Sequence, residues 1–249
     1  MKSALPVVFW ITFLFYSLTF IFTLFRKKKA GAISSAAGLI TNISGLIMLV
    51  LLSGHAPVFR LFESFMLGAF FLAIMGVLFT SQGEKLPDVR FWVWLEMMLL
   101  MAITALANKE PAPFAYDYND LYIVFFHILR IAVVAITLFS SALYIQSRFD
   151  NKRGDSIAVY RAHQGRNFLI LGAMLFLTAE YVGIRWCLRG WGDFWQWGPG
   201  FFQSTIIVLL FMLAVHVPGS NHGQGKWRPR LGIICGFLIL GLIAYRSTL

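Results

Sequence analysis

The sequence predicts an all-α, polytopic integral membrane protein, a bundle of about eight transmembrane helices. Of its 249 residues, 59% are hydrophobic and only 13% are charged, whereas a soluble domain averages about 45–50% apolar and about 25% charged residues. The apolar residues form long runs with few charges, which is typical of membrane-spanning helices. Lysine and arginine gather in alternate connections between these runs, as they do in multi-pass membrane proteins.

Eight apolar runs define the expected helices, and short polar connections separate them. The expected spans cover residues 6–25, 36–52, 64–79, 91–107, 121–145, 168–187, 201–217 and 231–245. The first run is not expected to be a cleaved signal peptide, because basic residues 26–29 follow it where a small-residue cleavage site would stand. We find no soluble domain and no convincing repeat, so residues 1–249 are expected to form a single membrane domain.

The basic residues predict the orientation of these spans. One set of alternate connections holds 14 of the 21 lysine and arginine residues. These are Arg26, Lys27, Lys28, Lys29, Lys85, Arg90, Arg148, Lys152, Arg153, Arg161, Arg166, Lys226, Arg228 and Arg230. That side is expected to be cytoplasmic, which places both termini on the non-cytoplasmic side of the cell inner (cytoplasmic) membrane. The net charge of +10 is then explained by the topology in the lipid bilayer, and a nucleic-acid partner is not expected.

The last outward connection has an unusual composition. Four of the eight tryptophans, Trp186, Trp191, Trp195 and Trp197, fall within residues 186–202, spaced by glycine and proline. One interpretation is an aromatic belt, because tryptophan prefers the headgroup region. The other is a flat apolar platform. A belt spreads its aromatic residues over many helix ends, whereas these four tryptophans lie in one connection. A platform of this kind would suit a porphyrin.

Several segments resemble the CcsA/ResC family of cytochrome c biogenesis proteins. Residues 191–197, Trp-Gly-x-x-Trp-x-Trp, resemble the family's tryptophan-rich (WWD) signature WGxxWxWD, and residues 183–186 resemble the Gly-x-x-Trp that precedes it. His127 and His216 stand where the family places an exterior and an intramembrane histidine. Residues 54–64, Gly-His-Ala-Pro-Val-Phe-Arg-Leu-Phe-Glu-Ser, resemble its GHxPLSNLYES segment. The resemblance covers about residues 50–245.

The resemblance implies a haem-handling protein that presents haem b at the outer face of the membrane. A CcsB-like membrane partner and apocytochrome c are the implied partners. His127 and His216 would ligate haem iron, since a neutral imidazole is a strong haem ligand. Trp191, Gly192, Trp195 and Trp197 would shelter the porphyrin. If the chain is active as an enzyme, it is a subunit of a cytochrome c haem lyase. For each histidine, the alternative is a hydrogen-bonded helix residue that binds no metal.

The chain departs from the family pattern in ways that leave two other functions open. Gly198 stands where the signature has aspartate, and Gly200 and Phe201 replace a Lys-Glu pair. The family's second exterior histidine follows the final span, and this sequence ends at Leu249 before that position. One alternative is a degenerate HemX-like relative that regulates haem metabolism without lyase activity. The other is a membrane subunit that anchors redox-complex partners or binds quinol.

Two of the charged residues within expected spans form a further candidate site. Arg130 and Glu180 each lie about nine residues or fewer from an exterior helix end, roughly 10–13 Å deep. Buried charges in a membrane normally pair or serve a site, so we expect Arg130 and Glu180 to face each other. Arg130, one turn from His127, could instead bind a haem propionate or a quinone headgroup, or extend to the lipid headgroups. His55 and Trp186 are additional candidates for the haem site.

Overall fold

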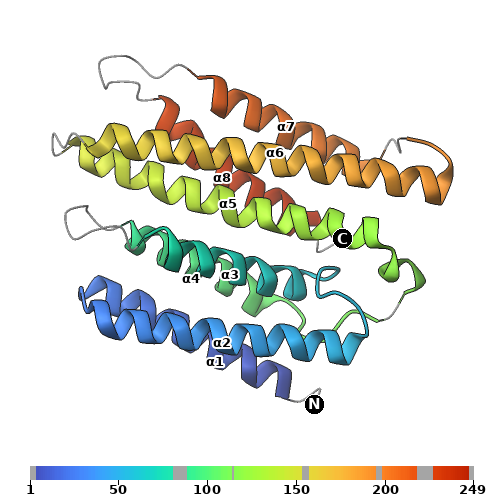
Figure 1. Ribbon diagram of the computed structural model, residues 1–249, viewed down its shortest axis with the longest axis horizontal. Coiled ribbons are helices and arrows are strands. Elements are labelled where there is room, and N and C mark those ends of the chain that lie inside the picture. Colours follow the sequence, from blue (N-terminus) through green and yellow to red (C-terminus); the bar gives the residue numbers. More distant parts are fainter. Residues whose placement is uncertain are drawn as a thin grey trace. The chain divides into compact units, whose positions relative to one another are not determined.

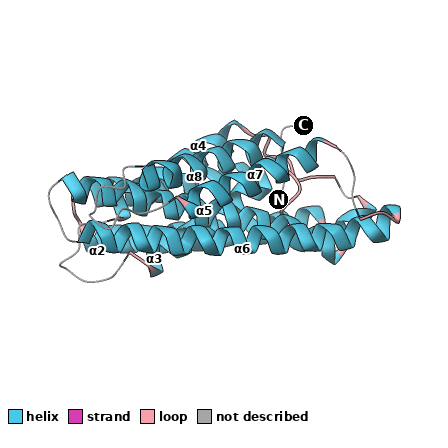
Figure 2. Cartoon of the chain, turned by 90° about the horizontal axis from the view of Figure 1, so that it is seen from above, coloured by secondary structure: helices cyan, strands magenta, loops and turns pink. Residues whose placement is uncertain are grey.

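The computed structural model describes residues 4–80, 89–113, 115–152, 157–194, 198–217 and 227–246, with only the backbone for Tyr116, Asp117, Trp191, Pro199 and Arg246. Within these residues it holds eight α-helices, one short 3-10 helix and no strand (Figures 1 and 2). The α-helices are α1 (Ala4–Leu24), α2 (Lys28–Ser53), α3 (Leu61–Leu78), α4 (Arg90–Leu106), α5 (Leu121–Lys152), α6 (Ile157–Trp191), α7 (Pro199–His216) and α8 (Trp227–Arg246). The all-α helical class is therefore confirmed.

The chain divides into two compact units. The first unit is Met1–Asn119, with α1 to α4, and the second unit is Asp120–Leu249, with α5 to α8. Each has its own packed helices, so each is described by itself. The expectation of one membrane domain over residues 1–249 stays a prediction.

Six helices are long and apolar enough to cross a membrane, namely α1, α2, α3, α5, α6 and α8. The chain is therefore a multi-pass membrane protein. Helix α4 has 17 residues and includes Glu96, and the apolar part of α7 covers Gly200–His216. Membrane crossing by these two shorter helices, and hence the count of eight spans, stays a prediction.

Several helices extend well beyond the apolar runs that predicted them. Helix α5 continues to Lys152, seven residues past the expected end, and α6 begins at Ile157, eleven residues before the expected start. The additional turns are polar and basic, so hydrophobicity alone does not detect them, but arginine, lysine and glutamine are good helix formers. Figure 2 shows α6 as one unbroken helix.

A polar contact lies inside the apolar core of the first unit. The Asn42 side-chain amide of α2 donates to the Tyr16 hydroxyl of α1 at 3.1 Å, and the Tyr16 ring lies 5.7 Å from the Trp94 ring of α4. A Cβ at Gly38 would stand 2.6 Å from the Tyr16 ring, so only glycine fits there. Small residues and interhelical hydrogen bonds are the usual means of joining helices in a membrane.

The second unit is built around the long antiparallel pair α5 and α6 (Figure 1). Helix α8 packs against α5, and α7 packs against α6 and α8. Helix α5 begins at the end of the unit where α6 finishes and α7 begins, which we call the outer end. The opposite end, where α5 finishes and α6 and α8 begin, carries most of the arginines and is called the basic end. The outer end holds most of the predicted site.

Candidate functional site

Asp120 and Arg189 organise the outer end of the second unit. The Asp120 carboxylate accepts a hydrogen bond from the Tyr122 N–H at 2.8 Å, so it caps the first turn of α5. A second Asp120 oxygen lies 3.6 Å from the Arg189 guanidinium of α6, which also lies over the Tyr122 ring at 5.5 Å. The start of α5 is thereby joined to the last turns of α6.

The expected pairing of Arg130 with Glu180 is confirmed. Nη2 of Arg130 on α5 lies 3.6 Å from Oε1 of Glu180 on α6, which is an ion-pair distance rather than a hydrogen bond. The same Nη2 donates a hydrogen bond at 3.1 Å to the Ser204 hydroxyl of α7. Arg130 is only 5% exposed. Three helices therefore meet at one buried guanidinium, which explains how the membrane interior tolerates the charge.

Aromatic rings enclose the same guanidinium. The Arg130 guanidinium carbon lies 4.9 Å from the Phe126 ring centre and 5.2 Å from that of Phe176. A Cβ at Gly183 would stand 3.0 Å from the Phe126 ring, so this glycine lets α6 approach α5 closely. Ring faces attract cations, and more strongly where water is excluded. The cluster therefore holds a positive charge, and Glu180 supplies the anionic group beside it.

His127 lies beside this cluster, as the sequence predicted from its position in α5. Its side chain is half-buried, and its ring lies 5.2 Å from the Phe126 ring in an edge-on arrangement. His127 precedes Arg130 by three residues, so the two side chains leave α5 on adjacent positions of one face. An imidazole and a guanidinium thus come together within one helical turn.

The tryptophan-rich segment is described only at its edges. Helix α6 continues to Trp191, and Gly192 follows in the left-handed region with φ of 74°, where glycine is favoured. Trp195 and Trp197 lie outside the described residues, as does the Trp191 side chain. Trp186 is half-buried on α6. The porphyrin-binding platform therefore stays a prediction.

His216 does not approach His127. It is the exposed last residue of α7, and its Nδ1 donates to the Met212 carbonyl at 2.8 Å. Ser204, which contacts Arg130, precedes His216 by twelve residues, so about 18 Å of helix separates the two levels. The two histidines are therefore at different heights in the second unit and could serve only separate sites.

His55 lies in the first unit and is engaged by the backbone. It is 4% exposed, with Nδ1 2.8 Å from the Ala56 carbonyl oxygen and Nε2 3.1 Å from that of Ala112. The fully buried Glu63 accepts hydrogen bonds from the Ala112 N–H at 2.7 Å and the Phe59 N–H at 3.2 Å. His55 and Glu63 together fasten the segment around Ala112 to the start of α3. This contact gives His55 a structural role.

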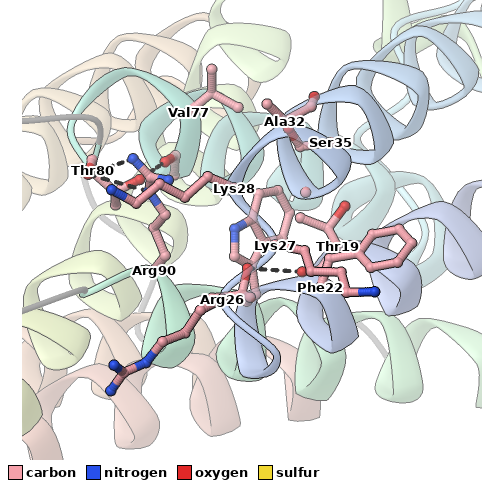
Figure 3. A pocket seen from close by; sticks show the side chains of 14 residues that line it. Thr19, Phe22, Arg26, Lys27, Lys28, Ala32, Ser35, Val77, Thr80 and Arg90 are labelled. Atoms are coloured by element: carbon pink, nitrogen blue, oxygen red, sulfur yellow. Dashed lines mark hydrogen bonds between the residues drawn. The ribbon is translucent and has the colours of Figure 1, made fainter. Parts of the chain in front are cut away.

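A hollow of about 190 Å³ lies in the first unit, at the end where α2 and α4 begin (Figure 3). Arg90 donates from Nε and Nη2 to the Thr80 carbonyl at 3.3 and 3.2 Å at its rim. The lining includes Phe22, Trp94 and three further basic residues. None of the residues predicted to handle haem lines this hollow.

Sequence reasoning did not identify a polar cluster at the basic end of the second unit. Asp150, which is fully buried, lies 3.1 Å from Nε of Arg161 and accepts a hydrogen bond from Gln146. Tyr144, on the same helix, is also fully buried. Asp150 and Arg161 were missed because the fifth span was expected to end at residue 145 and the sixth to begin at residue 168. The spacing of Asp150 four residues after Gln146 was the available signal.

Two known proteins are similar to the chain. No protein-family model matches the chain. The chain is 25% identical over 187 residues to protein NrfI of Wolinella succinogenes; the match covers 70% of this chain but only 20% of NrfI. It is 22% identical over 258 aligned positions to the cytochrome c biogenesis protein CcsA of Prochlorococcus marinus, covering 89% of this chain and 82% of CcsA. This multi-pass membrane protein is therefore similar, along most of its length, to a cytochrome c biogenesis protein.

Proposed function

We propose that the chain handles haem during cytochrome c biogenesis, presenting it at the outer face of the cell inner membrane. The similarity to CcsA over 89% of the chain carries this proposal. The proposed partners are apocytochrome c and a CcsB-like membrane protein. Haem is the cargo in this function, and an active complex would join it to the cysteines of the apocytochrome.

The residues at the outer end of the second unit suit a haem molecule. Haem combines an iron that binds imidazole with an apolar ring and anionic propionates. His127 is half-buried, as an accessible imidazole ligand should be, and Arg130 supplies a fixed cation one turn away. Phe125 and Phe202 are 53% and 59% exposed, so apolar surface is present on α5 and α7. In this proposal His127 binds iron and the tryptophans cover the ring, while Arg130 stays paired with Glu180.

The test is the absorption spectrum of the full chain purified in a mild detergent. We expect a haem Soret band in the wild type, and its loss or shift in His127→Ala. His163→Ala is the matched control, because His163 is an exposed histidine near the basic end of α6. His216→Ala tests the second predicted ligand. A wild-type chain without haem, even when produced with a CcsB-like partner, would contradict the proposal.

Gly198 favours a second candidate function, that of a HemX-like relative without lyase activity. It is the N-cap residue of α7 and provides no side-chain cap, whereas aspartate would provide both a cap and a negative charge. A chain of this kind would regulate haem metabolism or anchor other redox subunits. Stable co-purification with redox subunits, in the absence of bound haem, would favour this second function.

A further inference from the structure

Tyr144 is packed against glycines on two neighbouring helices. Its ring on α5 packs against Gly165 of α6, where a Cβ would stand 3.2 Å away, and against Gly232 of α8, where a Cβ would overlap the ring. Both neighbouring helices therefore need glycine at this level. The two glycines allow three helices to close on one phenol ring, whose side chain is 0% exposed.

The Tyr144 hydroxyl makes no hydrogen bond with any described residue. A buried hydroxyl without a partner costs about 1–3 kcal/mol, so such groups normally have one. Phenylalanine would fill the same space without this cost. The hydroxyl is therefore a group whose partner is not part of the described chain.

Two arginines flank this hydroxyl. Arg166 follows Gly165 on α6, and Arg228 precedes Gly232 by one turn of α8. Both glycines contact the Tyr144 ring, so each arginine leaves its helix within about one turn of that ring. Nε of each is buried and donates to no partner within the described residues. Asp150 does not neutralise them, because it is occupied by Arg161 at 3.1 Å.

All three groups lie at the same expected membrane level. Tyr144 is next to the last residue of the expected span 121–145, Arg166 stands two residues before the span 168–187, and Arg228 stands three before 231–245. Three independent spans thus place them at the boundary between hydrocarbon and headgroups on the basic side. Lipid phosphate groups lie at this level, and positively charged clusters there attract anionic lipids.

We propose that Arg166, Arg228 and the Tyr144 hydroxyl bind a phosphate group at the basic end of the second unit. Arginine presents several N–H donors in a planar fork that suits phosphate oxygens, and the hydroxyl adds one donor. The phosphate could belong to an anionic lipid or to a soluble molecule, and the site chemistry is the same for both. This inference does not depend on haem handling.

The experiment measures lipid retention by the full chain in a neutral detergent, using native mass spectrometry. Phosphatidylglycerol and phosphatidylcholine with identical acyl chains are added separately, with and without millimolar inorganic phosphate. We expect preferential retention of phosphatidylglycerol, weakened at least roughly tenfold in Arg166→Gln/Arg228→Gln, since this variant removes both cationic donors. Arg148→Gln/Lys152→Gln is the matched control, because it removes the same charge from exposed residues at the same end.

Tyr144→Phe keeps the packed ring and keeps the proposal testable if the arginine variant does not fold. We expect it to weaken phosphatidylglycerol retention without lowering the melting temperature of the lipid-free protein. Retention that inorganic phosphate does not reduce identifies a lipid headgroup, whereas displacement by phosphate identifies a soluble phosphate ligand. The proposal is overturned if phosphatidylglycerol shows no preference and phosphate has no effect. It is also overturned if the control pair weakens retention as much as the arginine pair.

Discussion

Arg130 shows how one charged side chain is held within the apolar core of the second unit. Its guanidinium is 5% exposed, lies 3.6 Å from Glu180, donates to Ser204 and contacts two aromatic rings. A buried pair is not by itself a strong source of stability, because both charges lose their hydration. Removing one partner is nevertheless costly, because the remaining charge stays buried.

Glu180→Gln is therefore expected to destabilise the protein by about 3 kcal/mol, since Arg130 would keep its charge without a counter-charge. Thermal unfolding in detergent measures the change. The double variant Arg130→Met/Glu180→Met should recover much of the loss, because it removes both charges. Equal destabilisation by the single and double variants would show that the pair is not coupled.

A second prediction at the level of single residues concerns Glu63 in the first unit. Glu63→Gln replaces a carboxylate that accepts from the Ala112 and Phe59 amides, and glutamine has only one accepting oxygen. We expect hydrogen exchange at the Ala112 amide to accelerate roughly tenfold, for a loss of about 1.4 kcal/mol. Glu110→Gln, at an exposed neighbour, is the control and should leave that amide unchanged.

At the scale of the element, the start of α7 is the least supported helix end of the outer site. Gly198 precedes Pro199, which suits the first helical position, but no side chain caps the exposed N–H groups. The helix therefore begins with a proline that fixes its first turn and without the hydrogen bond that most N-cap residues supply. The Phe201 and Phe202 amides donate to the Gly198 carbonyl, so the Gly200 amide is the donor that a side-chain cap would satisfy.

Gly198→Asp should stabilise α7 by about 1 kcal/mol through a new side-chain cap and its charge at the helix N-terminus. Hydrogen exchange of the amides at residues 200–202 should slow accordingly. Gly198→Ala is the control, because alanine supplies no cap. If alanine slows exchange as much as aspartate, the effect comes from the loss of glycine flexibility and not from capping.

At the scale of the whole molecule, the distribution of charge predicts the orientation. Lys29 belongs to the first basic connection, which is predicted to be cytoplasmic. Lys109 lies in a connection that is predicted to be on the opposite side of the membrane. In a chain with Cys187 and Cys235 replaced by serine, a membrane-impermeant thiol reagent added to intact cells should label Lys109→Cys and leave Lys29→Cys unlabelled. Labelling of Lys29→Cys alone would show the opposite orientation and contradict the proposed outer face.

Composition and residue spacing predicted the helical class and the pairing of Arg130 with Glu180, because both depend on local hydrophobicity and on the cost of buried charge. They did not predict the long polar ends of α5 and α6, since those turns depend on helix propensity and neighbours. The contacts that Tyr144 and His55 make were also not predicted. Their partners come from helices or loops distant in sequence, which spacing along one helix does not reveal.

The length of α6 has a mechanical consequence. Its 35 residues extend over about 52 Å, well beyond a hydrocarbon core of about 30 Å. Its apolar run, residues 168–187, matches this core, so a bilayer of another thickness makes the helix tilt or kink, or deforms around it. Thinner or thicker bilayers would therefore change the height of Gly192 above the lipid surface, and with it the reach of the chain toward a docked protein.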